Sequence, residues 1–108
     1  MTGAIIGLVT CSSRAEARKI ARRILTGKLA GCVNILDGLE SHYWWHGKLE
    51  RARECLLLIK TTPARERAVM SAVKAAHSYE VPEVLFLPVM AGERNYLNWL
   101  RKSVKTND

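Results

Sequence analysis

The segment from Leu39 to Lys60 constrains the fold most, because it predicts one long β-hairpin. Residues 41–45 are rich in β-forming side chains, and residues 55–59 form an unbroken apolar run of strand length. Between them, His46-Gly47 is typical of a two-residue loop in which glycine supplies a positive φ. We therefore expect two long antiparallel strands that meet at this turn.

Three consecutive aromatic residues, Tyr43, Trp44 and Trp45, stand next to the turn. Side chains alternate between the faces of an extended strand, so Trp44 points away from the other two and the arm has aromatic surface on both faces. Such an arm needs a cover, because exposed strand edges and apolar patches favour aggregation. Either the rest of the chain folds over the arm or another subunit covers it. We favour another subunit, because the chain is short.

The length of 108 residues predicts one domain over residues 1–108 with a modest core, and the apolar fraction of 48% is typical of a globular protein. The net charge of +7 permits acidic partners, nucleic acid included. We nevertheless expect no nucleic-acid binding, because no recognition-helix pattern is evident and the basic residues of the first predicted helix form a solvated face opposite an apolar stripe. These basic residues are Arg14, Arg18, Lys19, Arg22 and Arg23.

The three cysteines, Cys11, Cys32 and Cys55, predict free thiols. Their odd number and unpaired spacing argue against a disulfide framework. Each lies in an apolar, strand-like context, where a free cysteine behaves as a small buried hydrophobe. No apolar run approaches the length of a membrane span, and residues 5–9 are too short for the apolar part of a signal peptide. We expect a cytoplasmic protein that does not bind membranes.

The first half of the chain predicts a strand, a helix and a second strand. Residues 4–11 form an apolar strand, and Ser13 and Glu16 have the spacing of a capping box, a hydroxyl followed three residues later by a carboxylate. The helix ends near Gly27. A second strand over residues 32–36 leads through a kink into the long hairpin. The apolar face of the helix comprises Ala17, Ile20, Ala21, Ile24 and Leu25.

The second half predicts a helix, a strand and a short final helix. Thr62 can cap the helix and Pro63 suits its first position. Residues 77–82 form a loop, and the strand at 84–89 contains a proline, which implies an edge strand or a bulge. A third helix over residues 95–104 is followed by a polar, frayed tail. Inward-facing positions are Val69, Ala72, Val73 and Ala76 in the second helix, and Tyr96, Leu97 and Leu100 in the third.

This order, β-α-β-β-α-β with a terminal helix, is typical of an α+β, ferredoxin-like fold. Right-handed crossovers put both main helices on one face of the sheet. Residues 5–6, 56–59 and 84–87 are apolar at successive positions, hence on both faces of their strands. The face without helices needs a cover as well, and self-association supplies it.

Catalysis finds little support in the sequence, so we expect no enzyme. The glycines are scattered rather than gathered in a phosphate-binding loop, and no Ser or Cys has a nucleophile-elbow pattern. His42 and His46 are four residues apart on a strand, at a separation of about 13 Å, and cannot share an ion within one subunit.

A compact set of potential ligands lies in the loop from His77 to Glu83, which Pro82 stiffens. Imidazole suits copper and zinc, and a carboxylate adds a harder donor. The simpler alternative is that His77 ends the second helix and interacts favourably with its C-terminal dipole. Spacing alone leaves both interpretations open.

Several motifs in order resemble the CutA family of divalent-cation tolerance proteins over nearly the whole chain, residues 5–104. The motifs are Leu29-Ala30-Gly31-Cys32-Val33-Asn34-Ile35, Tyr43-x-Trp45-x-Gly47-Lys48, Leu58-Ile59-Lys60-Thr61, His77-x-Tyr79-Glu80-Val81-Pro82-Glu83, Leu87-Pro88-Val89 and Tyr96-Leu97-Asn98-Trp99-Leu100. The resemblance implies a ferredoxin-like homotrimer, similar to the PII signalling proteins. It also implies tolerance of copper and other divalent metal ions, with copper binding, and no enzymatic activity.

The resemblance carries over to particular residues. It implies a metal site of copper type at His77 and Glu83, with Cys32 or a group from an adjacent subunit. It implies a cleft with Lys60, Tyr79, Glu80 and Trp45. The two-faced aromatic pattern of the hairpin places the trimer interface at Tyr43, Trp44 and Trp45. Three positions depart from the family pattern. Val9 stands where some members have a first-strand cysteine, and Cys11 lies two residues on. Ser78 replaces the usual loop proline, which is expected to loosen the loop, and His46 replaces a glutamate.

Three functions follow from these observations. The first is a trimeric divalent metal-ion tolerance protein. The alternatives are a PII-like sensor that binds a small anionic ligand or nucleotide at subunit clefts, favoured by the basic charge and Lys60, and a non-catalytic trimeric scaffold.

Overall fold

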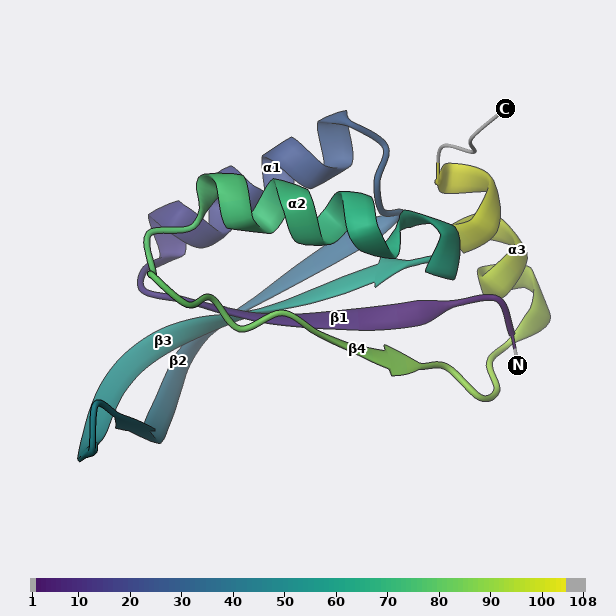
Figure 1. Ribbon diagram of the computed structural model, residues 1–108. Helices are drawn as coiled ribbons and strands as arrows, with labels where there is room; N and C mark the ends of the chain where they lie inside the picture. The colour runs from purple at the N-terminus through teal and green to yellow at the C-terminus, as the bar shows by residue number, and fades with distance from the viewer. Residues whose placement is uncertain (1, 105–108) are drawn as a thin grey trace.

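The computed structural model describes residues 2–104, and the predicted polar tail at 105–108 lies outside this range. The elements follow in the predicted order, β-α-β-β-α-β with a final helix (Figure 1). Their bounds are β1 Ile5–Cys11, α1 Arg14–Thr26, β2 Cys32–Trp45, β3 Lys48–Thr61, a 3₁₀ turn Pro63–Arg65, α2 Glu66–Ala76, β4 Leu85–Pro88 and α3 Arg94–Ser103.

The four strands form one antiparallel sheet in the order β2-β3-β1-β4. β1 lies in the centre, with Cys11 opposite Cys55 of β3 and Ile5 opposite Pro88 of β4. The proline-containing strand is therefore an edge strand, as predicted, because its missing N–H cannot serve a second neighbour. This is the ferredoxin-like topology that the sequence predicts.

Helices α1 and α2 lie side by side on the same face of the sheet, which confirms the predicted crossovers (Figure 1). Their apolar stripes and the facing strand residues make the core. Its fully buried members are Val9, Cys11, Ala17, Ile20, Ile24, Leu57, Ile59, Val69 and Val73. A smaller cluster joins the helix α3 to the start of β1 through Ala4, Leu97 and Leu100. Tyr96 was predicted to face inward, and this was wrong: it is 42% exposed and stacks on Trp99.

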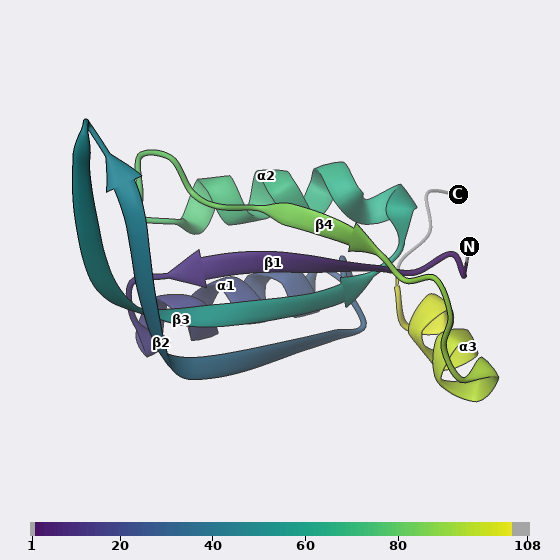
Figure 2. The ribbon, with the colours of Figure 1, turned by 90° about the horizontal axis from the view of Figure 1, so that it is seen from below.

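The predicted hairpin is present and longer than expected, because β2 continues without interruption through the predicted kink. At the position of the predicted kink the strand has a bulge between Leu36 and Leu39, where Gly38 has φ 80°. At the tip both His46 (φ 49°) and Gly47 (φ 77°) have positive φ, the requirement of a type I′ turn. Beyond the bulge, β2 and β3 bend away from the sheet as a two-stranded arm (Figures 1 and 2).

The helix caps follow the predictions in part. The Ser13 hydroxyl accepts the N–H of Glu16 at 3.2 Å, as a capping residue should. The Glu16 carboxylate reaches back one residue further than a capping box requires and accepts the N–H of Ser12 at 3.1 Å. The predicted cap at Thr62 was wrong, because its side chain makes no capping hydrogen bond and the helix begins with a 3₁₀ turn.

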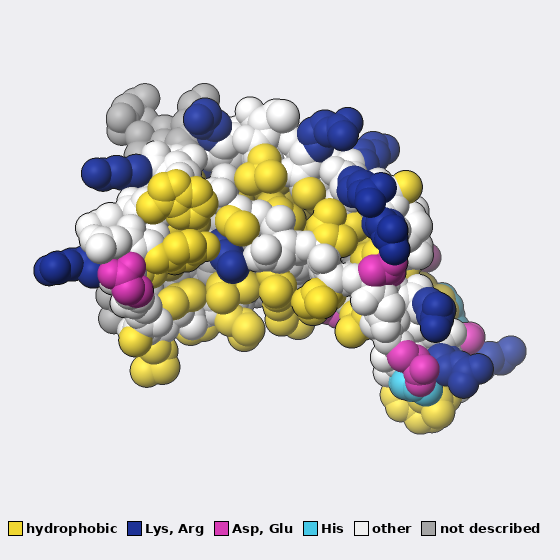
Figure 3. All heavy atoms as spheres, turned by 180° about the vertical axis from the view of Figure 1, so that it is seen from behind, with side chains coloured by type: hydrophobic (Ala, Val, Ile, Leu, Met, Phe, Trp, Pro, Cys, Tyr) yellow, Lys and Arg dark blue, Asp and Glu magenta, His cyan; other side chains and the backbone are white. Residues whose placement is uncertain are grey.

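The sheet face opposite the two helices is largely without cover in the protomer. In Figure 3 hydrophobic side chains line the lower margin of the molecule, the side of the sheet away from the helices, and the arm projects at the lower right. Large apolar residues that are at least half exposed include Leu36, Trp44, Leu49, Leu85, Leu87 and Met90. A surface of this extent on a small protein marks an interaction site.

The cysteines are all unpaired, as predicted. Cys11 and Cys55 are buried, whereas Cys32 is only half-buried and so departs from the expectation. The Cys55 thiol donates to the Asp37 carboxylate, which Arg14 also contacts. The guanidinium of Arg14, followed by the Cys55 thiol and the Gly38 N–H, lowers the pKa of Asp37 to about 2.

No helix within residues 2–104 has the length and hydropathy needed to cross a membrane.

We predict that Gly47→Ala lowers the melting temperature, because an L-residue at φ 77° is strained by about 1–2 kcal/mol. Gly27→Ala is the matched control, since Gly27 has φ −81°, which alanine adopts freely, and should leave the melting temperature unchanged or raise it. Thermal melts at one protein concentration compare the two. Equal melting temperatures would show that the turn can relax without cost.

Candidate functional site

Two groups of functional side chains meet at the end of the sheet from which the arm projects. One is a buried group of potential metal ligands, and the other is a cleft beside the arm. The loop that connects α2 to β4, residues 77–84, contributes to both.

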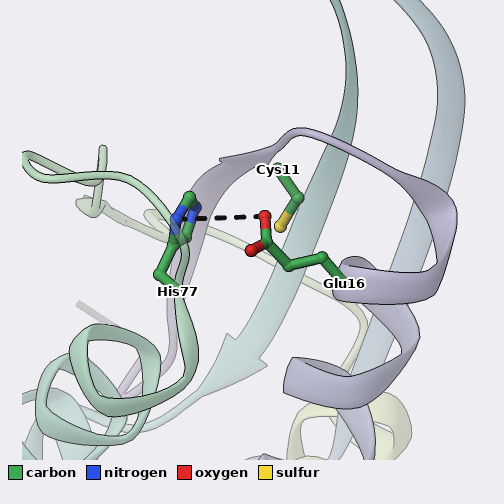
Figure 4. A group of neighbouring side chains, drawn as sticks. All are labelled: Cys11, Glu16 and His77. Carbon is green, nitrogen blue, oxygen red and sulfur yellow. Dashed lines mark ion pairs between the residues drawn. The ribbon is translucent and has the colours of Figure 1, made fainter.

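The buried group consists of Cys11, Glu16 and His77 (Figure 4). Cys11 is the last residue of β1, Glu16 lies in the first turn of α1, and His77 follows the last residue of α2. One ligand atom of each residue lies within 4.8 Å of the others. The fold therefore brings a thiol, a carboxylate and an imidazole together from three separate elements.

The His77 ring is held at both nitrogens, and its side chain is fully buried. Its Nε2 lies 2.6 Å from the carbonyl oxygen of Thr10, and its Nδ1 accepts the N–H of Tyr79 at 3.1 Å. The carbonyl can only accept, so Nε2 carries the proton and Nδ1 presents its lone pair. Nδ1 also faces Glu16 Oε1 at 3.9 Å. A backbone carbonyl on the far ring nitrogen is the usual arrangement behind a metal-binding histidine.

Glu16 joins the helix α1 to the loop. Its Oε2 accepts the N–H of Ser78 at 2.8 Å, and its Oε1 accepts the N–H of Ser12. Burial raises the pKa of this carboxyl, but the hydrogen bonds from Ser78 and Ser12 and the His77 ring outweigh burial and lower it. A proline at position 78 could not donate this bond. Ser78, where the family resemblance led us to expect a proline and, without it, a looser loop, thus provides a hydrogen bond to α1.

The Cys11 thiol is fully buried, and this governs its chemistry. Burial, together with the charge of Glu16, raises its pKa to about 12. The thiol is therefore protonated at neutral pH and inert as a nucleophile. A cation at this place would have to displace the thiol proton in order to use the sulfur as a ligand.

The predicted ligand set of His77, Glu83 and Cys32 is not assembled within one protomer. Cys32 pairs with Lys60, toward the opposite end of β3, and its thiol contacts Asn34. Glu83 lies in the cleft. Sequence reasoning missed Cys11 and Glu16 as companions of His77. The capping-box pattern had marked Glu16 as lying at a helix start, and the strand pattern had placed Cys11 at a strand end, but no local signal joins them to the loop.

The cleft has a volume of about 560 Å³ and lies between the arm, the end of β1 and the loop. Its lining comprises Thr10, Ser41, His42, Tyr43, Trp45, Glu54, Tyr79, Glu80, Val81 and Glu83. Of the predicted cleft residues, Trp45, Tyr79 and Glu80 are present, and Lys60 is absent because its Nζ lies 5.9 Å from the centroid of the Tyr96 ring instead. The alternation of the aromatic residues is confirmed: Tyr43 and Trp45 face the cleft, and Trp44 is 72% exposed on the other side.

Two lining residues of the cleft are joined by a hydrogen bond of 2.7 Å from the Tyr79 hydroxyl to Glu54 Oε2. The Tyr79 ring packs against the His77 ring at a centroid distance of 4.6 Å. Burial, followed by the hydrogen bond to Glu54 and its charge, raises the pKa of Tyr79 well above its ordinary value. The folded protein thus requires the protonated hydroxyl.

We predict that Tyr79→Phe lowers the free energy of unfolding by about 1–3 kcal/mol, because Glu54 loses its hydrogen-bond donor. Because the pKa of Tyr79 is raised in the folded protein, its protonated hydroxyl contributes its full stabilisation below the unfolded pKa of 10.0. This stabilisation is lost as the pH rises above that value toward the folded pKa. Wild-type stability should therefore fall more steeply above about pH 10 than that of Tyr79→Phe.

Tyr96→Phe is the control, since within residues 2–104 the Tyr96 hydroxyl makes no side-chain hydrogen bond. Thermal melts across the alkaline range compare the three proteins. Parallel pH profiles for wild type and Tyr79→Phe would contradict the assignment of the alkaline loss to Tyr79.

Comparison with known proteins gives a consistent result. A family described as CutA1 divalent ion tolerance protein matches residues 5–103. A protein of Escherichia coli named divalent-cation tolerance protein CutA is 38% identical over 104 residues, which cover 96% of this chain and 93% of the relative. A rice protein named CutA 1, chloroplastic, is 44% identical over 101 residues; the match covers 94% of this chain but only 57% of the rice protein.

Solved structures agree with the sequence comparison. The divalent cation tolerance protein CutA1 of Thermus thermophilus is 42% identical, with a TM-score of 0.92 and coverage of 94% of this chain and 99% of that one. CutA1 of Oryza sativa is 41% identical, with a TM-score of 0.93 and coverage of 99% and 100%.

Proposed function

Because this chain belongs to the CutA1 divalent ion tolerance family, we propose that it is a divalent metal-ion tolerance protein that binds a cation of the copper or zinc type. The observation that carries the proposal is the approach of one sulfur, one oxygen and one nitrogen donor, from Cys11, Glu16 and His77, within 4.8 Å. A mixed set of thiol, carboxylate and imidazole suits borderline and soft ions such as zinc and copper. Nothing in this proposal requires catalysis.

The donor set fits such an ion in its chemistry. The hydrogen bond from His77 Nε2 to the Thr10 carbonyl orients the ring so that Nδ1, whose lone pair accepts the Tyr79 N–H, also faces Glu16. Bound ions need donor atoms about 2.0–2.3 Å away, so the group must contract slightly, and Tyr79 must give up its hydrogen bond to Nδ1. Because the Cys11 thiol must lose its proton, affinity is expected to fall as the pH falls.

We predict that Cys11→Ser weakens binding of Zn²⁺ and Cu²⁺ by at least about tenfold, because it removes the sulfur donor. Cys32→Ser is the matched control, since Cys32 lies far from His77 in the protomer and should bind as wild type does. Isothermal titration calorimetry measures affinity and stoichiometry. His77→Ala should also lose the ion. If Cys32→Ser or Glu83→Gln loses the ion and Cys11→Ser keeps it, the ligands are those predicted from the family resemblance.

The proposal includes self-association as a homotrimer in the cytoplasm. Its support is the apolar face opposite the helices and the exposed Trp44, which a second and a third copy would cover. Interfaces of this kind are large and core-like. The three free thiols suit a reducing compartment.

We predict a particle of three times 12.1 kDa by light scattering at micromolar concentration. Trp44→Ala should destabilise it by about 3–5 kcal/mol per site, because truncating a large aromatic in a core-like interface has this cost. Leu25→Ala is the control and should be near neutral, because Leu25, predicted to lie on the apolar face of α1, is 39% exposed. A mass of 12.1 kDa, or a neutral Trp44→Ala, would contradict the assembly.

A further inference from the structure

The cleft beside the arm has the dimensions of a small-molecule site. Its volume of about 560 Å³ lies within the range of ligand pockets, roughly 300–1,000 Å³. Its lining residues come from the arm on one side and from the loop after α2 on the other. The ribbon of Figure 2 shows these two segments next to each other. Neither Cys11 nor Glu16 lines it, so this space is distinct from the buried ligand group.

The charge of the lining is opposite to that of the protein. The chain has 17 Lys and Arg against 10 Asp and Glu, yet the lining contains Glu54, Glu80 and Glu83 and no Lys or Arg. Burial, followed by the charge of Glu54, raises the pKa of Glu83. The charge of Glu54 thus disfavours the charged form of Glu83, and the three acidic side chains make the lining unfavourable for an anionic ligand.

Glu54 is a buried acid without a countercharge. It is 6% exposed, its one side-chain hydrogen bond within residues 2–104 comes from the Tyr79 hydroxyl, and no Lys or Arg in that range forms an ion pair with it. A buried carboxyl group is costly unless a charge or several donors compensate it. The cleft is the side from which a positive group can reach it.

Aromatic rings provide the remaining walls. Tyr43 and Trp45 line the cleft from the arm, and Tyr79 lines it from the loop. The faces of such rings attract organic cations, and a desolvated site strengthens the attraction. Acidic groups combined with aromatic faces recognise an ammonium group on an alkyl chain.

We propose that this cleft binds a small aliphatic amine, with its ammonium group at Glu54 and its alkyl chain between the rings of Tyr43, Trp45 and Tyr79. A metal ion alone does not account for the cleft. Within residues 2–104 the one group of three clustered His, Cys, Asp or Glu side chains is Cys11, Glu16 and His77, and none of these lines the cleft. The protein would thus bind an organic cation in the cleft in addition to the metal ion, and the two sites would use different residues.

The test uses calorimetric titration of the full-length protein with 1,4-diaminobutane in the presence of a chelator. The neutral isostere 1,4-butanediol is the ligand control, and it should not bind. Glu54→Gln should weaken diamine binding by about tenfold or more, because it removes the charge and keeps an acceptor for Tyr79. Glu50→Gln, which removes the same charge from β3 outside the lining, should bind as wild type does.

The outcomes separate the proposal from its alternatives. Equal binding of the diol, unchanged affinity in Glu54→Gln, or no binding of the diamine by the wild-type protein would each overturn it. Absence of binding would also be the result if a basic side chain of a second copy filled the cleft. Light scattering and circular dichroism of both variants confirm that assembly and fold are kept, so that a loss in Glu54→Gln reports on the site.

Discussion

The structure depends on the pairing of β3 with different neighbours along its length. Its C-terminal half lies between β1 and β2 and belongs to the core sheet, with Leu57 and Ile59 fully buried. Its N-terminal half pairs with β2 alone and forms the arm. Glu54 and Cys55 lie where the two halves meet, which is why the buried ligand group, the cleft and the bulge are all found at this level of the sheet.

Local patterns in the sequence predicted the elements, the hairpin turn and the edge strand well, because each depends on a few neighbouring residues. The turn required only His46-Gly47, and the edge strand only Pro88. Tyr96 was misplaced because helical periodicity does not say how wide the buried stripe is, and α3 packs through Leu97 and Leu100 alone. The family resemblance identified His77, but its companions Cys11 and Glu16 come from two other elements, and no spacing rule connects them.

Polar contacts hold the first three residues of the loop after α2. His77 is fixed to Thr10, Ser78 to Glu16 and Tyr79 to Glu54, so three consecutive residues attach to β1, α1 and β3. Each contact is one short hydrogen bond; those of His77 and Tyr79 are partly buried, and that of Ser78 is exposed. The two proposed sites share this segment: His77 serves the buried group, and Tyr79, two residues on, borders the cleft.

The central position of β1 has a consequence for how the chain reaches its fold. β1 is made first, yet both its neighbours come from later in the chain, with Ile5 opposite Thr61 on one side and Pro88 on the other. The β2–β3 hairpin closes locally, whereas these pairings join distant segments and carry a larger loop-closure entropy. On a ribosome, the apolar strand at the N-terminus must therefore wait for most of the chain to emerge, and the sheet is complete only after β4 has left the exit tunnel.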